Sequence, residues 1–249
     1  MKIQPVSGVC LAVFLVATAG AQETNLSRSE VTAIKAKIVT VQQAMGGDPS
    51  GYLKESEDFD LPTDFNGAQG GKYWPITSGV SLRYGDRGSA EAEATLEKAA
   101  EEYQAKMAAA VASGNIGEIT RMSEELTRMQ AAAMAPAERK EPMNVYVRLN
   151  QNPTVGIDPD AVVLEQPGVI VLRDEQSDGK GDVTVYIDPV ALAATEELSK
   201  IELRTADDGV TSKTGVYHVV IQLNGTLADS EAWAQTFDFD AMLGVIDAR

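Results

Sequence analysis

Residues 89–135 read SAEAEATLEKAAEEYQAKMAAAVASGNIGEITRMSEELTRMQAAAMA, two segments rich in alanine and glutamate around a break at Ser113-Gly114-Asn115. Apolar residues recur at helical spacing in both segments, which is typical of amphipathic helices. Asn115 can cap the second helix, and Pro136 ends its pattern. The stretch therefore predicts an antiparallel helical hairpin. The side chains expected between its two helices are Leu96, Tyr103, Met122, Leu126 and Met129.

A further helix is predicted upstream of this hairpin. Ser27 and Glu30 have the spacing of a capping box, and Gly46-Gly47 can end the helix in a left-handed cap. Between them, apolar residues recur three and four positions apart, which predicts one buried stripe. The stripe consists of Val31, Ile34, Ile38, Val41 and Met45.

Residues 48–88 read as mostly irregular. Asp48-Pro49 and Gly51 are turn residues. An acidic cluster follows, and then a glycine-rich stretch that contains Tyr73 and Trp74. Only residues 80–84 read as a short strand. The acidic cluster consists of Glu55, Glu57, Asp58, Asp60 and Asp64.

After Pro142 the pattern changes to strands. Residues 145–150 and 183–187 alternate between apolar and polar side chains, and Gln166-Pro167-Gly168 separates two apolar runs as a turn would. Asp188-Pro189 predicts the start of a short helix that runs through Leu198. The remaining predicted strands are residues 201–204, 216–223 and, more weakly, 233–239.

Helices therefore come first and strands second, which predicts an α+β fold. It comprises an N-terminal helix and an αα-hairpin followed by a mainly antiparallel β-sheet, because most connections between strands are short. Residues 22–136 form the helical region with the irregular acidic and Gly/aromatic loop. Residues 137–249 form the β-rich region with one short helix.

Residues 1–21 have the features of a secretory signal peptide. Lys2 precedes an apolar run at residues 9–17, and Ala19-Gly20-Ala21 supplies the small residues of a cleavage site before Gln22. The run is too short for a permanent membrane anchor. We therefore expect an exported, soluble protein without a stable membrane span, periplasmic or secreted. Its alanine content and the absence of cysteine after Cys10 favour a bacterial envelope.

The chain is strongly acidic, with 37 acidic and 21 basic residues and a formal charge of −16. Removal of Lys2 with the signal peptide would leave 20 basic residues and a charge of −17. This field repels nucleic-acid backbones and anionic membrane surfaces, and we expect no binding to nucleic acid. Basic protein surfaces, cationic peptides and divalent metals remain admissible partners.

Few residues are suited to catalysis or to binding a metal. His218 is the only histidine, and we expect it on the less buried side of a strand. No Gly-x-Ser-x-Gly nucleophile elbow is present, and structural zinc would need more histidines or cysteines. Residues 174–182 partly resemble a calcium loop, but the twelfth position is Val185, where a glutamate is needed. A polar hairpin loop explains these residues better.

No catalytic, cofactor-binding or metal-ligating residue is therefore assigned, and no cofactor is expected. The sequence favours a non-enzymatic envelope protein that binds a protein or peptide partner or has a structural role. One alternative is a carboxylate-based hydrolase of envelope carbohydrate, with Tyr73 or Trp74 as a platform for the sugar. Another is a low-affinity divalent-metal binder that uses its acidic loops.

Overall fold

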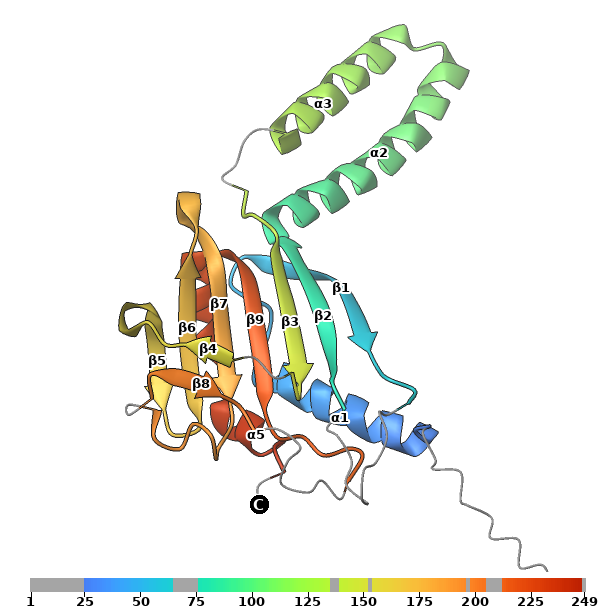
Figure 1. Ribbon diagram of the computed structural model, residues 1–249. Coiled ribbons are helices and arrows are strands. Elements are labelled where there is room, and N and C mark those ends of the chain that lie inside the picture. The colour runs from blue at the N-terminus through green and yellow to red at the C-terminus, as the bar shows by residue number, and fades with distance from the viewer. Residues whose placement is uncertain are drawn as a thin grey trace, which may run out of the picture.

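The computed structural model describes residues 25–64, 76–134, 139–151, 154–195, 198–204 and 212–247. Its centre is an antiparallel sheet of seven strands in the order β1-β2-β3-β9-β7-β6-β5 (Figure 1). These strands are β1 (Tyr52–Asp60), β2 (Ser78–Asp86), β3 (Met143–Leu149), β5 (Val162–Gln166), β6 (Val169–Glu175), β7 (Lys180–Ile187) and β9 (Val219–Thr226). A second, two-stranded sheet pairs β4 (Thr154–Gly156) with β8 (Lys200–Glu202). The helices are α1 (Arg28–Ala44), α2 (Arg87–Ser113), α3 (Ile116–Met134), α4 (Leu227–Ala234) and α5 (Phe239–Leu243).

The α+β prediction is confirmed: a helix and a helical hairpin accompany a large antiparallel sheet. In α1 the predicted capping box is present, since Ser27 Oγ accepts from the Glu30 amide at 3.3 Å and Glu30 Oε2 accepts from the Ser27 amide at 2.7 Å. Gly46 follows the helix with φ +83°, as a left-handed cap requires. Ile34 and Ile38 of the predicted stripe are buried.

The two faces of the large sheet differ. The back face carries Val147, Val185 and Ile221, and it forms the main core with α1, α4 and α5. The front face carries the alternate residues, among them Tyr146 and Gln222. At its β6–β7 side a smaller apolar cluster joins the front face to the β4–β8 sheet. The cluster consists of Ile170, Leu172, Tyr186, Leu192, Ile201, Leu203 and Val220.

The strand predicted at residues 80–84 is confirmed as part of β2, but the expectation of irregular structure is wrong for residues 52–60, which form β1. β1 pairs with β2 from Tyr52 to Asp60, and six of its nine residues in succession are exposed. β1 therefore has no alternation of apolar and polar side chains to reveal it. The sheet also crosses the division between residues 136 and 137, because β2 and β3 are neighbours.

Two further expectations need correction. Residues 233–239 are not a strand: α4 ends at Ala234, and α5 starts after Asp238, whose carboxylate accepts from the Ala241 amide at 2.9 Å. Trp233 packs edge-on against Tyr84 of β2 at 5.3 Å between ring centroids, which fixes α4 on the back face. Residues 189–194 form turns instead of a regular helix. Asp188 does cap these turns, accepting from the Val190 and Ala191 amides at 3.0 and 3.1 Å.

Candidate functional site

The helices α2 and α3 form an arm, residues 87–134, that projects beyond one end of the sheet (Figure 1). The predicted hairpin is confirmed: Gly114 ends α2 with φ +68°, and Asn115 Oδ1 accepts from the Glu118 amide at 3.3 Å. Between the helices, Ala110 and Met122 are buried. Four of the five predicted contact residues are only half-buried: Leu96, Tyr103, Leu126 and Met129.

Among the side chains that the structure describes, the arm contributes none to the core of the sheet. Ala110 and Met122, which are buried between its helices, belong to neither of the two apolar clusters described above. At its tip Val111 is 61 % exposed and Ile116 is 76 % exposed. No helix in the described part of the chain, the arm included, is long and apolar enough to cross a membrane.

The root of the arm is anchored by charged side chains. Asp86 caps α2 by accepting from the Ser89 amide at 2.7 Å, and the hydrogen bonding from Ser89 lowers the pKa of Asp86. Lys140, just before β3, donates to Asp229 of α4 at 2.7 Å. Tyr52 donates to the other oxygen of Asp229 at 3.0 Å; burial and this hydrogen bond raise the pKa of Tyr52 to about 12. Asp86 thus fixes the start of α2, and Lys140 ties the segment that enters β3 to α4.

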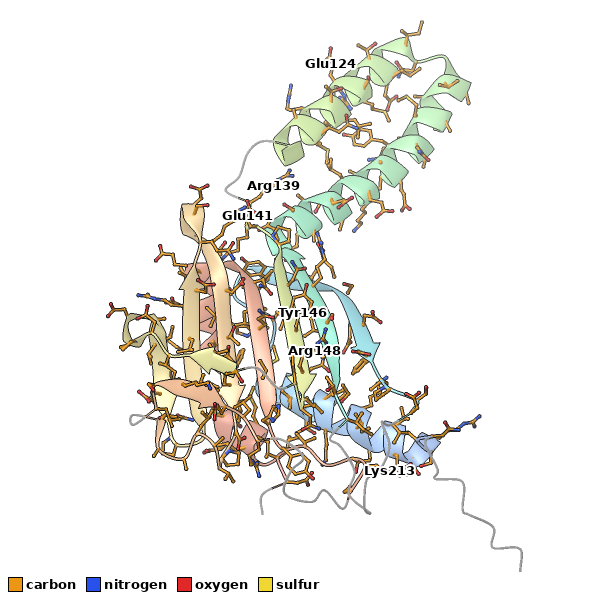
Figure 2. All side chains as sticks on the ribbon, in the orientation of Figure 1. Glu124, Arg139, Glu141, Tyr146, Arg148 and Lys213 are labelled. Carbon is orange, nitrogen blue, oxygen red and sulfur yellow. The ribbon has the colours of Figure 1, made fainter. Side chains whose placement is uncertain are left out.

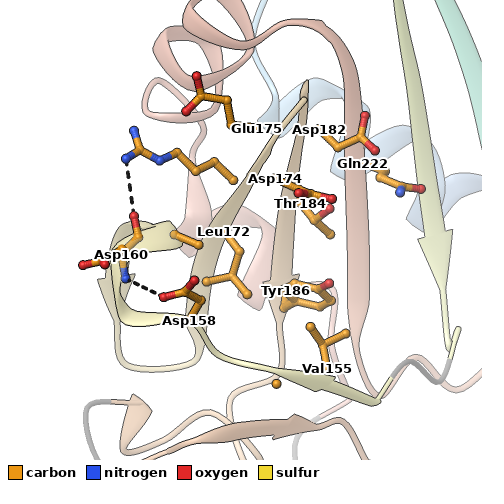
Figure 3. A pocket seen from close by; sticks show the side chains of 13 residues that line it. Val155, Asp158, Asp160, Leu172, Asp174, Glu175, Asp182, Thr184, Tyr186 and Gln222 are labelled. Atoms are coloured by element: carbon orange, nitrogen blue, oxygen red, sulfur yellow. Dashed lines mark hydrogen bonds between the residues drawn. The ribbon is translucent and has the colours of Figure 1, made fainter. Parts of the chain in front are cut away.

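A cavity of about 590 Å³ lies on the front face of the sheet, beside η1 (Pro159–Ala161) (Figure 3). Leu172 and Tyr186 supply apolar surface there. Five carboxylates line the cavity, from Asp158, Asp160, Asp174, Glu175 and Asp182. Within the ranges that the structure describes, no three acidic or histidine side chains come together as a metal site would require. The low-affinity metal-binder alternative therefore stays a prediction.

The residues of the partial calcium loop form a hairpin, as predicted. β6 and β7 pair from Val169–Ile187 to Glu175–Gly181, with the short 3₁₀ turn η2 (Ser177–Gly179) between them. Asp178 and Gly179 adopt positive φ angles of 64° and 72°, which close the turn.

The acidic cluster at residues 55–64 lies mainly on β1 at the edge of the sheet. Glu55 pairs with Arg83 at 2.9 Å, and Glu57 pairs with Lys54 at 3.2 Å. These two acids therefore have cation partners within the sheet. Tyr73 and Trp74, the expected carbohydrate platform, lie outside the described residues, as does the predicted signal peptide. The hydrolase alternative therefore stays a prediction.

The expectation for His218 is wrong, since its side chain is buried, with 1 % exposed. Its Nε2 lies 2.5 Å from the Gln151 carbonyl oxygen, and Nδ1 has no hydrogen bond. Burial lowers the pKa of His218, which favours the neutral imidazole. His218 precedes β9 and is not among the residues that line the acidic cavity. It is therefore a residue of the interior.

The front face near β3 is more polar. Figure 2 shows Tyr146 and Arg148 side by side on this strand, and the Arg148 guanidinium lies 5.6 Å from the centre of the Tyr146 ring. Gly79 of β2 pairs with Arg148, and a Cβ at this position would clash with the Val147 carbonyl oxygen and would lie 2.7 Å from Arg148 Nη1. Glycine therefore leaves the space in which the guanidinium rests on the sheet.

The sequence reasoning missed Val111 and Ile116 as candidate binding residues. Both are apolar residues that flank the Ser-Gly-Asn turn, and a side chain at a hairpin tip has little of its own chain to pack against. That combination was the available signal.

In comparisons with known proteins, no family model, no curated protein and no solved structure matches this chain.

Proposed function

We propose that this chain is an exported, non-enzymatic protein that binds a protein partner through the α2–α3 arm. The observation that carries the proposal is that the arm forms the connection between β2 and β3. β2 and β3 are adjacent antiparallel strands, with Tyr84 opposite Met143. A two-residue turn is enough to join such strands. Here two helices of 27 and 19 residues separate them.

The fold does not need this insertion, because none of the arm's described side chains belongs to either core cluster. Ordering a residue costs about 1–2 kcal/mol of backbone entropy, and the arm offsets this cost only through its own partly buried seam. A role outside the domain explains why the arm is present. The exposed Val111 and Ile116 at its tip supply apolar surface for a partner.

Charge favours a basic partner. The arm carries eight glutamates against five lysines and arginines, and the whole chain carries −16. A second copy of the chain would bring the same sign of charge, so self-association is disfavoured. Export is supported by the pattern of residues 1–21, with Lys2, the apolar run and the Ala19-Gly20-Ala21 cleavage site.

Photo-crosslinking in the native host tests the proposal. The photoreactive residue p-benzoylphenylalanine replaces Val111 or Ile116 at the tip. The control is Val190, which is 49 % exposed on the body of the protein. We expect one crosslinked protein, the same from both tip positions and absent from position 190. Failure to crosslink from the tip, or identical products from position 190, would contradict the proposal.

A deletion variant then tests the arm with the purified partner. Residues 87–140 are replaced by Asn-Gly, which forms a two-residue type I′ turn. The variant should keep the circular-dichroism signature of the sheet, because both core clusters remain complete. It should lose binding to the partner. A folded deletion variant that binds as tightly as the intact chain would remove the arm from the proposed function.

A further inference from the structure

A groove runs between the two helices of the arm, in the half nearer the sheet. Its volume is about 350 Å³. The residues that line it come from the first part of α2 and the last part of α3: Glu93, Leu96, Glu97, Ala100, Leu126 and Gln130. On α2 they are spaced at three and four positions, so they follow a single stripe along the helix.

The apolar residues of this groove are incompletely covered. Leu96 and Leu126 are half-buried, whereas Ala110 and Met122 nearer the tip are buried. Two packed helices enclose side chains only along the line of contact between them, and a third helix is the usual means of covering the remainder. The groove thus has the shape and the apolar floor that an added helix needs.

The charges beside the groove indicate the chemistry of that helix. Glu93 and Glu97 lie next to Leu96, and the described residues that line the groove include no lysine or arginine. Among the ion pairs of the described residues, none involves either glutamate. A lysine or arginine from a partner would meet two carboxylates that have no cation of their own. A second copy of the arm would present glutamates to glutamates, so like charges disfavour it.

We infer that the groove binds an amphipathic, basic helix of the partner protein, whose apolar stripe packs on Leu96 and Leu126 and whose flanking lysines or arginines pair with Glu93 and Glu97. This inference rests on the proposed function of the arm. It adds the class of segment that the partner presents and the place where that segment binds.

The probe is a synthetic amphipathic helix of about 18 residues, or five turns. It has a leucine stripe flanked by lysines and carries a fluorescein label. Binding to the full mature chain is followed by fluorescence anisotropy. The E93K/E97K variant should weaken binding at least about tenfold through like-charge repulsion. The matched control, E91K/E124K, has the same net charge but alters residues outside the groove lining, and it should change affinity less than about twofold.

Two further measurements complete the test. Leu126→Asp should abolish binding of the lysine peptide, and a peptide with glutamates in place of the lysines should bind E93K/E97K better than it binds the native chain. Circular dichroism of each variant checks that the arm remains helical. Equal weakening in the groove variant and in its control would overturn the inference, since attraction would then come from the overall charge. Unchanged binding in Leu126→Asp would also overturn it.

The crosslinking from residues 111 and 116 separates this inference from the proposed function. If the same partner is still crosslinked in E93K/E97K with undiminished yield, the arm binds its partner but the groove does not contribute. If the tip captures no partner even in the native chain, the proposed function itself is wrong. Loss of the crosslink in E93K/E97K alone, with E91K/E124K unaffected, supports both.

Discussion

Replacing Asp188 by alanine removes a carboxylate that holds four hydrogen-bond donors at once. The side chain is fully buried, with 0 % exposed. It accepts from the Val190 and Ala191 amides at 3.0 and 3.1 Å, and from the Arg204 amide and Nε at 2.9 and 2.8 Å. Asp188 follows β7 of the large sheet and Arg204 follows β8, so the pair ties the two sheets together.

The loss of stability follows from the Arg204 guanidinium that Asp188→Ala leaves without its carboxylate partner. The Arg204 side chain is 13 % exposed and would lose the Asp188 carboxylate, although Nη2 would still donate to the Tyr217 carbonyl at 2.6 Å. Breaking a buried ion pair on one side costs about 3–5 kcal/mol. We expect a loss of about 4 kcal/mol for Asp188→Ala, a large part of the roughly 5–15 kcal/mol that stabilises a typical domain.

Urea denaturation followed by circular dichroism measures this loss. A double-mutant cycle with Arg204→Met isolates the pair, because the methionine fills similar volume without a charge. Since the charges are in contact, the double variant should be less destabilised than the sum of the single variants, by about 1–3 kcal/mol. Additive losses would refute the ion pair as the cause, and so would an Asp188→Ala midpoint equal to that of the native chain.

The other predictions concern the arm, the histidine and the predicted leader. Leu126→Ala should cost about 1–2 kcal/mol by denaturation, less than the 2–5 kcal/mol of a fully buried leucine, because Leu126 is half-buried; an unchanged midpoint would mean that the α2–α3 contact does not stabilise the arm. Because burial lowers the pKa of His218 below its usual 6.5, the unfolded chain takes up the proton first. The stabilising contribution of neutral His218 is therefore complete above about pH 6.5 and decreases as the pH falls toward the lowered pKa, so His218→Gln should flatten the dependence of unfolding free energy on pH below 6.5. Equal slopes for the variant and the native chain would contradict this. Intact-mass measurement of the exported protein should give a chain that starts at Gln22, and a mature product that retains Cys10 would contradict the signal peptide.

Local sequence patterns were sufficient to predict an element where its stabilising contacts come from residues close in the sequence. The capping box of Ser27 and Glu30, the left-handed Gly114 between α2 and α3 and the turn at Gly168 all depend on residues a few positions apart. The alternation in β3 also predicted its two faces, since Val145 and Val147 are buried and Tyr146 is half-buried. The helical hairpin could therefore be recognised from the sequence, although the exposure of its tip and groove could not be measured there.

Where the sequence failed, distant residues decide the structure. β1 contains Glu55, Glu57 and Asp58, and it is a strand because β2 supplies its backbone hydrogen-bond partners, from 19 positions away at Asp60 to 34 positions away at Tyr52. The tertiary structure likewise decided that His218 is buried, because the segment containing Gln151 supplies its hydrogen-bond acceptor from 67 positions away. Trp233 is helical where its surroundings read as a strand, since Tyr84 and Phe237 fix its ring on the back of the sheet. Sequence alone thus determined the elements whose hydrogen bonds and apolar stripes are local, whereas pairing and burial between distant segments depended on the free energy of the complete fold.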